Sequence, residues 1–86
     1  MAFYRIEWKR SATRELKNLP KDAAANILRS VTTLAENPFP EGVRKVSGAE
    51  HTFRIRRGSY RVIYTVSAQV LLIEVIRVGH RKDVYR

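Results

Sequence analysis

The sequence predicts an α+β domain made of an N-terminal strand, a helical hairpin and then an antiparallel C-terminal sheet. Three observations predict it. Apolar residues alternate with charged ones over residues 4–8, recur every three or four positions over residues 24–35, and alternate again on both sides of Gly58-Ser59. Because 86 residues form one modest core, we expect a single domain, 1–86, with the helices on one face of the sheet.

The first strand is expected where Tyr4, Ile6 and Trp8 alternate with polar residues, which gives it one buried face. A short helix should follow over Ala12–Asn18, with Ser11 as a plausible N-cap. Both elements present an apolar side, so both are expected to pack on the same core.

The second helix is expected from about Pro20 or Lys21 to Glu36, because proline is favoured in the first turn of a helix. Its apolar positions form an amphipathic stripe that should lie on the sheet. They are Ala24, Ile27, Leu28, Val31, Leu34 and Ala35. The proline-rich residues 37–42 cannot continue this helix and predict a loop, with a short strand at Val43–Ser47.

A β-hairpin is predicted around Gly58-Ser59, a pair suited to a type II′ turn with glycine first. In that register Arg56 lies opposite Arg61. Side chains then divide between two faces, because the period of a strand is two residues. One face is apolar and carries Phe53, Ile55, Tyr60, Val62 and Tyr64. The other carries Arg54, Arg56, Arg61 and Ile63.

The last predicted strand, Val70–Val78, is apolar on both sides apart from Glu74 and Arg77, so we expect it in the centre of the sheet. Glu74 is expected to pair with an arginine such as Arg77. No predicted helix covers the arginine face of the sheet, which should therefore be open, concave and basic.

Facing like charges destabilise a sheet, so the Arg56–Arg61 pair is a local cost that an external polyanion would offset. The alternative is a set of solvated arginines on an open face. The formal net charge of +9 favours a nucleic-acid or acidic protein partner. Residues 51–86 carry eight basic and two acidic groups, a net +6, so the site is expected in that half.

The same composition argues against several other classes of protein. There is no cysteine, and only His51 and His80 are present, so we expect neither a metal site nor a cofactor. The N-terminus has no apolar signal segment and no run approaches membrane-spanning length, which predicts a cytoplasmic protein without a membrane partner.

Five segments in order along the chain resemble the RelE/ParE superfamily of bacterial and archaeal toxins, over essentially the full length. They are L-K-N-L-P, a helix closing in E-N-P, K-V-S-G, F-R-I-R-R-G-S-Y-R-V-I-Y and V-G-H-R-K-D-V-Y. The resemblance implies a RelE-like fold and the toxin of a type II toxin–antitoxin system. RelE-like members are endoribonucleases that cut messenger RNA in the ribosomal A site, whereas ParE-like members poison DNA gyrase.

The basic and tyrosine positions match the RelE-like branch. ParE-like gyrase poisons usually lack these residues. The resemblance places Arg54 and Arg56 at two RNA-binding positions and assigns catalytic roles to Arg61, Arg81 and Tyr85. It also implies a RelB-like antitoxin, the ribosome and messenger RNA as partners. A ParE-like gyrase inhibitor and a non-catalytic nucleic-acid-binding relic are the alternatives.

The chemistry of these side chains suits metal-free RNA cleavage. Guanidinium groups give bidentate hydrogen bonds to phosphate and stay charged at any working pH, so Arg61 and Arg81 would stabilise the phosphorane. Two side chains are candidates for the role of general base. The phenol of Tyr85 would have its pKa lowered by neighbouring arginines, or would instead stack on a base. His80 titrates near neutrality and is otherwise placed at the RNA-binding surface.

Overall fold

A computed structural model describes residues 3–80 and contains two helices and five strands. In chain order they are β1 (Arg5–Trp8), α1 (Arg10–Lys17), α2 (Lys21–Thr33), β2 (Arg44–Lys45), β3 (Thr52–Arg57), β4 (Tyr60–Ser67) and β5 (Leu72–His80). The predicted α+β class and the order of the elements are confirmed.

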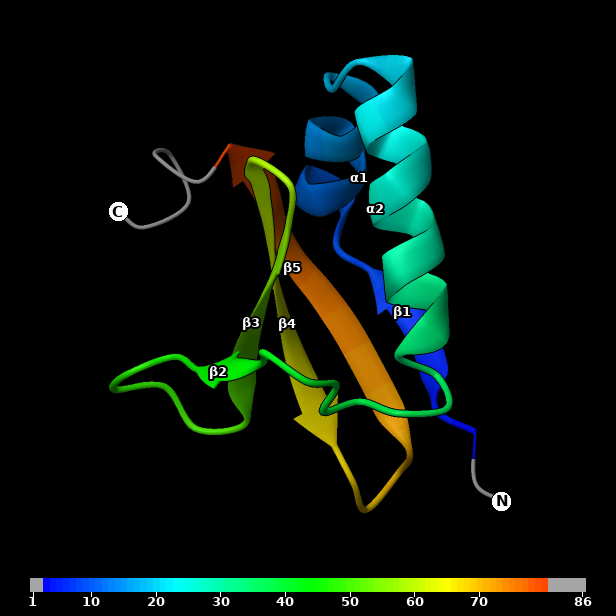
Figure 1. The fold of residues 1–86 in the computed structure, drawn as a ribbon. Coiled ribbons are helices and arrows are strands. Elements are labelled where there is room, and N and C mark those ends of the chain that lie inside the picture. The colour runs from blue at the N-terminus through cyan, green and yellow to red at the C-terminus, as the bar shows by residue number, and fades with distance from the viewer. Residues whose placement is uncertain (1–2, 81–86) are drawn as a thin grey trace.

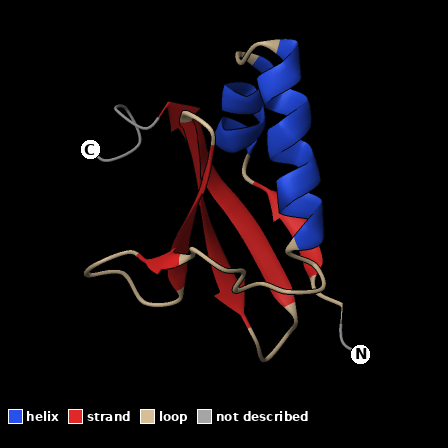
Figure 2. Cartoon of the chain, in the orientation of Figure 1, coloured by secondary structure: helices blue, strands red, loops and turns tan. Residues whose placement is uncertain are grey.

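The five strands form one sheet in the order β1-β5-β4-β3-β2 (Figure 1). The pairs within β2 to β5 are antiparallel, whereas β1 runs parallel to β5. The two helices lie together on one side of the sheet, as Figure 2 shows, and leave the other side without a helix. Neither helix in the described part of the chain is long and apolar enough to cross a membrane.

The predicted hairpin has the expected register, with Arg56 opposite Arg61 and Ile55 opposite Val62. Gly58 adopts a φ of +62° and Ser59 does not take a positive φ, which fits a type II′ turn and excludes type I′. A glycine at the first turn position carries no steric penalty for this backbone. The turn therefore fixes which residues of β3 and β4 share a face.

Strand β5 is central, as predicted, because it lies between β1 and β4. It begins two residues later than expected: Val70 and Leu71 lie in the turn before it, and Leu71 has a φ of +52°. A register shift opposite Ile63 and Tyr64 marks a β-bulge in the β4–β5 pair. A bulge changes which face successive side chains occupy. It explains why β5 lacks a simple alternation in sequence.

The predicted cap of the first helix is wrong. Lys9 occupies the N-cap position in an extended conformation with no side-chain hydrogen bond, and Ser11 lies inside α1. The reason is the preceding strand. The backbone N–H of Lys9 donates to the carbonyl of Val75 at 2.9 Å, so strand pairing continues to the residue at which the helix starts.

The predicted stripe of α2 is confirmed in part. Ile27, Val31 and Leu34 are buried, whereas Leu28 is 48% exposed, which contradicts its expected place in the core. Leu28 follows Ile27 by one residue and is therefore rotated by about 100° around the helix axis. Positions 27, 31 and 34 already cover the width that faces the sheet. The helix ends at Thr33, earlier than predicted.

Tyr64 anchors the core to the loop that follows α2. Its ring is fully buried, and its hydroxyl donates to the carbonyl of Pro38 at 2.6 Å. Burial raises the pKa of Tyr64 to about 12, against the opposing effect of Arg57. The neutral phenol is thus the form that the folded state prefers.

Substituting Tyr64→Phe is expected to lower the free energy of unfolding by about 1 kcal/mol at pH 7, because the Pro38 carbonyl loses its donor. The pKa in the folded state lies above the ordinary value of 10.0, so the stabilisation is complete below pH 10 and is lost as the pH rises toward about 12. Urea denaturation of the wild-type protein and of Tyr64→Phe at pH 7 and pH 11 measures the difference in free energy of unfolding. A stability difference that does not shrink at the higher pH would contradict it.

Candidate nucleic-acid interface

Two pairs of arginines face each other across neighbouring strands. Arg44 on β2 lies opposite Arg54 on β3, and Arg56 on β3 lies opposite Arg61 on β4. Residues 54 and 56 alternate with buried Ile55, whose side chain belongs to the core beneath the helices. The four guanidinium groups therefore come from three strands to the face that the helices leave uncovered. Each pair places like charges directly opposite one another, which destabilises a sheet.

The four arginines lie at different depths. Arg44 and Arg56 are exposed, Arg54 is half-buried, and Arg61 is only 5% exposed. The interpretation as solvated arginines on an open face is therefore wrong for Arg61. Burial, together with repulsion from Arg56 and Arg44, lowers the pKa of Arg54. An anion between these groups would relieve that repulsion.

A hollow of about 350 Å³ opens beside the exposed arginines. It is lined by Glu41, Gly42, Arg44, Arg54, Arg56 and Arg57. Its arginine lining suits a phosphate group. Arg44 was missed by sequence reasoning because the short strand at 43–47 was predicted without a register. The signal lies in the alternation: once Arg44 is paired with Arg54, it must share the face of Arg54.

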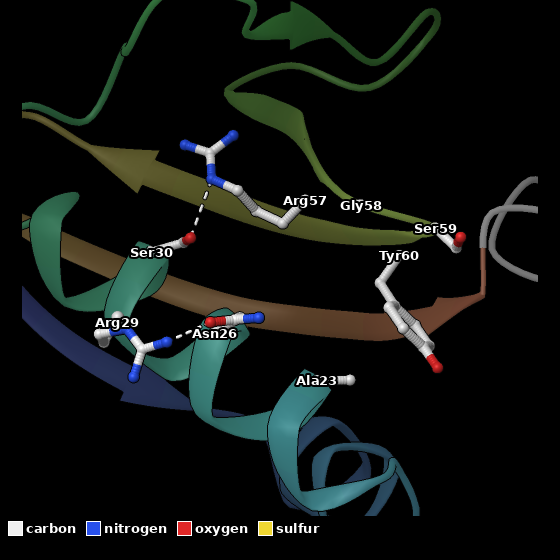
Figure 3. Close-up of a pocket in the computed structure, with 8 residues that line it drawn as sticks. All are labelled: Ala23, Asn26, Arg29, Ser30, Arg57, Gly58, Ser59 and Tyr60. Atoms are coloured by element: carbon white, nitrogen blue, oxygen red, sulfur yellow. Dashed lines mark hydrogen bonds between the residues drawn. The ribbon is translucent and has the colours of Figure 1, made fainter.

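Arg57 borders this hollow but bonds to α2. Its Nε donates to the hydroxyl of Ser30 at 2.8 Å, and its Nη1 donates to the carbonyl of Arg56 at 2.5 Å. Figure 3 shows Arg57 and Tyr60 bordering a second hollow, of about 470 Å³, between α2 and the hairpin turn. In this hollow Arg29 donates to Asn26. The hydrogen bond from Arg57 to Ser30 ties the hairpin to α2 and so holds its arginine-bearing strand in place.

The end of β5 lies beside the start of β4, next to the hairpin turn. Gly79 lies opposite Arg61, and His80 lies opposite Tyr60 with ring centroids 5.9 Å apart at an edge-to-face angle of 81°. His80 is exposed at the end of the strand. The predicted site residues Arg81 and Tyr85 lie outside the described residues. The structure therefore brings together Arg54, Arg56 and Arg61 on one face, whereas His80 shares the face of Tyr60 on the other side of the sheet.

The expected partnership between Glu74 and Arg77 is wrong. Arg77 forms an ion pair with Glu15 of α1, with 3.5 Å between Nη2 and Oε2. Glu74 instead lies between Thr65 of β4 and Glu7 of β1. Glu7 and Glu74 thus lie at the β1 side of the sheet, and the facing pair Arg44 and Arg54 lies at the β2 side. A polyanion on this face would be drawn to the β2 side.

A small basic α+β domain with a hairpin-borne arginine cluster is the architecture of a class of bacterial and archaeal toxins, and comparison with known proteins agrees. Residues 6–85 match the family described as the ParE toxin of type II toxin-antitoxin system, parDE. Toxin RelG of Mycobacterium tuberculosis is 31% identical over 87 residues, covering 96% of this chain and 97% of that protein. Putative toxin RelE1 of Methanocaldococcus jannaschii is 24% identical, with 96% of each covered.

Solved structures show the same fold. The RelBE2 toxin–antitoxin complex of M. tuberculosis contains a chain with a TM-score of 0.81 and 28% identity, covering 96% of this chain and 97% of that one. The RelE–RelB complex of Pyrococcus horikoshii gives 0.83 and 28%, covering 94% and 98%. The chain therefore belongs to the ParE toxin family of type II toxin–antitoxin systems, within the RelE/ParE superfamily, and is RelE-like.

Proposed function

We propose that this type II toxin is a metal-independent, ribosome-dependent endoribonuclease that cuts messenger RNA in the A site and so inhibits translation. The observation that carries the proposal is the convergence of four arginines from three strands on one sheet face, with Arg61 withdrawn from solvent. Several guanidinium groups on one face suit a ligand with concentrated negative charge. The backbone of RNA supplies such charge.

The reaction needs three things from the protein. A base removes the proton of the 2′-hydroxyl, whose oxygen attacks the neighbouring phosphorus. Cations stabilise the phosphorane, and an acid protonates the departing 5′-oxygen. The products are a 2′,3′-cyclic phosphate, or its 3′-phosphate, and a 5′-hydroxyl. We assign Arg61 and Arg81 to the phosphorane, Arg54 and Arg56 to the RNA backbone, and proton transfer to Tyr85, with His80 as its rival.

A RelB-like antitoxin is the expected protein partner. The M. tuberculosis and P. horikoshii relatives are both solved as toxin–antitoxin complexes. An acidic or amphipathic antitoxin segment that folds on binding would cover the basic face and compete with RNA for it. The toxin is proposed to act in the cytoplasm, where ribosomes and messenger RNA are found.

Inhibition of DNA gyrase is the second candidate, and the name of the matched family favours it. In that case the arginine face would be a protein-binding surface without catalysis. Expression in cells under a tight promoter separates the two. We expect incorporation of labelled amino acids to stop before any DNA damage response begins. A DNA damage response that precedes the arrest of translation would favour gyrase and overturn the nuclease.

Arg44 provides a test of the RNA path that needs no cleavage. We expect Arg44→Ala to weaken binding of a 2′-O-methyl RNA oligomer and to reduce the slope of log K against log salt by about 0.7, which corresponds to one lost phosphate contact on a single strand. Lys45 is the matched control, because it is also exposed on β2 but pairs with Phe53 and so points to the other face. Equal slopes for Arg44→Ala and Lys45→Ala would contradict the assignment.

A further inference from the structure

The outer edge of β5 loses its neighbouring strand before β5 ends. β1 pairs with Leu72 to Val75 only, and the chain then leaves the sheet at Lys9, whose N–H bonds to the Val75 carbonyl. Residues 76–80 of β5 therefore have a strand on the β4 side alone. An edge left in this way has backbone groups that need other partners.

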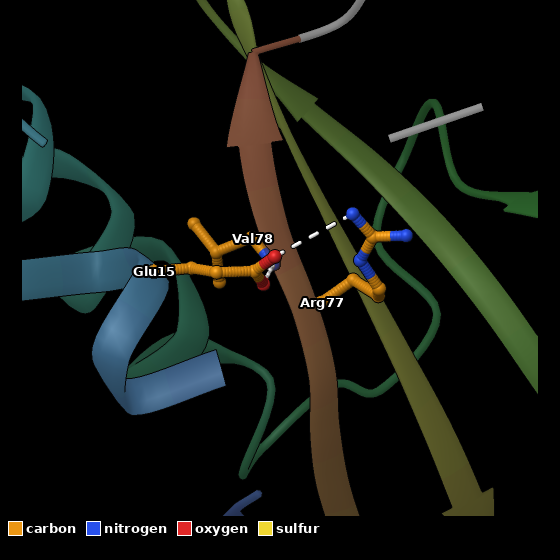
Figure 4. Close-up of polar contacts among 3 residues, drawn as sticks. All are labelled: Glu15, Arg77 and Val78. Carbon is orange, nitrogen blue, oxygen red and sulfur yellow. Dashed lines mark hydrogen bonds and ion pairs between the residues drawn. The ribbon is translucent and has the colours of Figure 1, made fainter. Parts of the chain in front are cut away.

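Glu15 of α1 takes the place of the missing strand at one point. Its Oε1 accepts a hydrogen bond from the backbone N–H of Val78 at 2.8 Å, and its Oε2 forms the ion pair with Arg77. Figure 4 shows the carboxylate reaching from the helix to the edge of β5 between these two residues. This acceptor satisfies a backbone N–H that has no neighbouring strand to bond with on that side. The helix thus clamps the end of the strand.

The clamped segment is the one that faces the candidate catalytic arginine. Val78 lies opposite Val62, and Gly79 lies opposite Arg61. The chain continues from His80 directly into Arg81 and, four residues later, Tyr85. The position of His80 and the pairing of Gly79 with Arg61 therefore depend on where the last residues of β5 are held.

We propose that Glu15 is a positioning residue for RNA cleavage, which acts by holding the backbone of Val78 and so setting β5 against Arg61. The inference rests on the proposed nuclease function. It assigns the effect to the hydrogen bond with Val78, not to the charge of Glu15 and not to Arg77. A displacement of about 1 Å at a catalytic group is enough to slow a reaction by about 10²-fold.

Two substitutions of Glu15 separate the hydrogen bond from the charge. Glu15→Gln keeps the length of the side chain and an oxygen that accepts from Val78, but it is neutral. Glu15→Asp keeps the charge but is one methylene shorter, which withdraws the acceptor from Val78. Arg77→Ala removes the ion pair and leaves the carboxylate in place.

The readouts are single-turnover cleavage of messenger RNA on programmed ribosomes and amide hydrogen exchange of Val78. We expect Glu15→Gln and Arg77→Ala to cleave at close to the wild-type maximal rate and to keep Val78 protected. Glu15→Asp should lose that protection and cleave about tenfold to 100-fold more slowly, with an unchanged half-saturating toxin concentration. Glu7→Asp is the matched control, since Glu7 forms an ion pair with exposed Arg5 at 3.0 Å.

A maximal rate for Glu15→Asp equal to or above that of Glu15→Gln would overturn the inference while leaving the nuclease intact. So would a loss that appears only as a higher half-saturating concentration, since that indicates weaker binding. Absence of cleavage by the wild-type protein would instead overturn the proposed function, and this inference with it. Thermal melting of each variant identifies any protein that fails to fold.

Discussion

Substituting Arg61→Met is expected to reduce cleavage of messenger RNA by about 10²–10³-fold, the effect typical of removing a preorganised group that stabilises charge in a transition state. Methionine keeps an unbranched apolar stem in the 5%-exposed site of Arg61, so the fold should persist. Removing one charge from the Arg56–Arg61 pair also relieves a like-charge contact across the strands. We therefore expect the variant to remain folded.

Two further variants make this expectation specific. Arg61→Lys keeps the charge but loses the planar fork that binds phosphate in a bidentate manner, so it should recover only part of the activity. Arg29→Met makes the same change on the exposed surface of α2 and should leave cleavage unchanged. Primer extension measures cleavage and urea denaturation measures stability. Full cleavage by Arg61→Met would remove Arg61 from the catalytic site.

The second large effect is expected from Tyr85→Phe, which should slow cleavage by about 10²–10⁴-fold if the phenol transfers a proton. Phenylalanine keeps the ring, so stacking on a base would survive the substitution. Tyr85→Ala removes both roles. Equal losses in the two variants indicate proton transfer, whereas a loss only in Tyr85→Ala indicates stacking.

His80→Gln tests the rival base under the same conditions. We expect a modest loss and an unchanged dependence of the rate on pH, because the assignment gives His80 a binding role. The residue is exposed at the end of β5 and packs edge-on against Tyr60, which suits binding or support. A larger loss for His80→Gln than for Tyr85→Phe, with removal of a titration near neutrality, would reverse the assignment.

Local patterns predicted much of this structure. The turn at Gly58-Ser59 and the alternation around it were enough to give the register of β3 with β4, and with it the faces of Arg56 and Arg61. The class of fold followed from the same reasoning. These features depend on residues close together in the chain, where the period of the pattern and the chemistry of the turn decide the outcome.

Features that depend on distant pairing could not be predicted in this way. The parallel pairing of β1 with β5 moved the start of α1 to Arg10 and made Ser11 an ordinary helical residue. The end of that pairing left an edge on which Glu15, not Glu74, became the partner of Arg77. The register of β2 likewise added Arg44 to the site. Each of these contacts joins residues whose separation in sequence carries no periodic signal.

The central claim is tested most directly by primer extension on a reporter messenger RNA, with purified toxin, in the presence and absence of programmed ribosomes. We expect cuts at fixed codon positions with the wild-type protein only when ribosomes are present, and none with Arg61→Met. Cuts of naked RNA would contradict ribosome dependence. No cuts in either condition, together with inhibition of gyrase supercoiling by the same protein, would contradict the nuclease and make the arginine face a protein-binding surface.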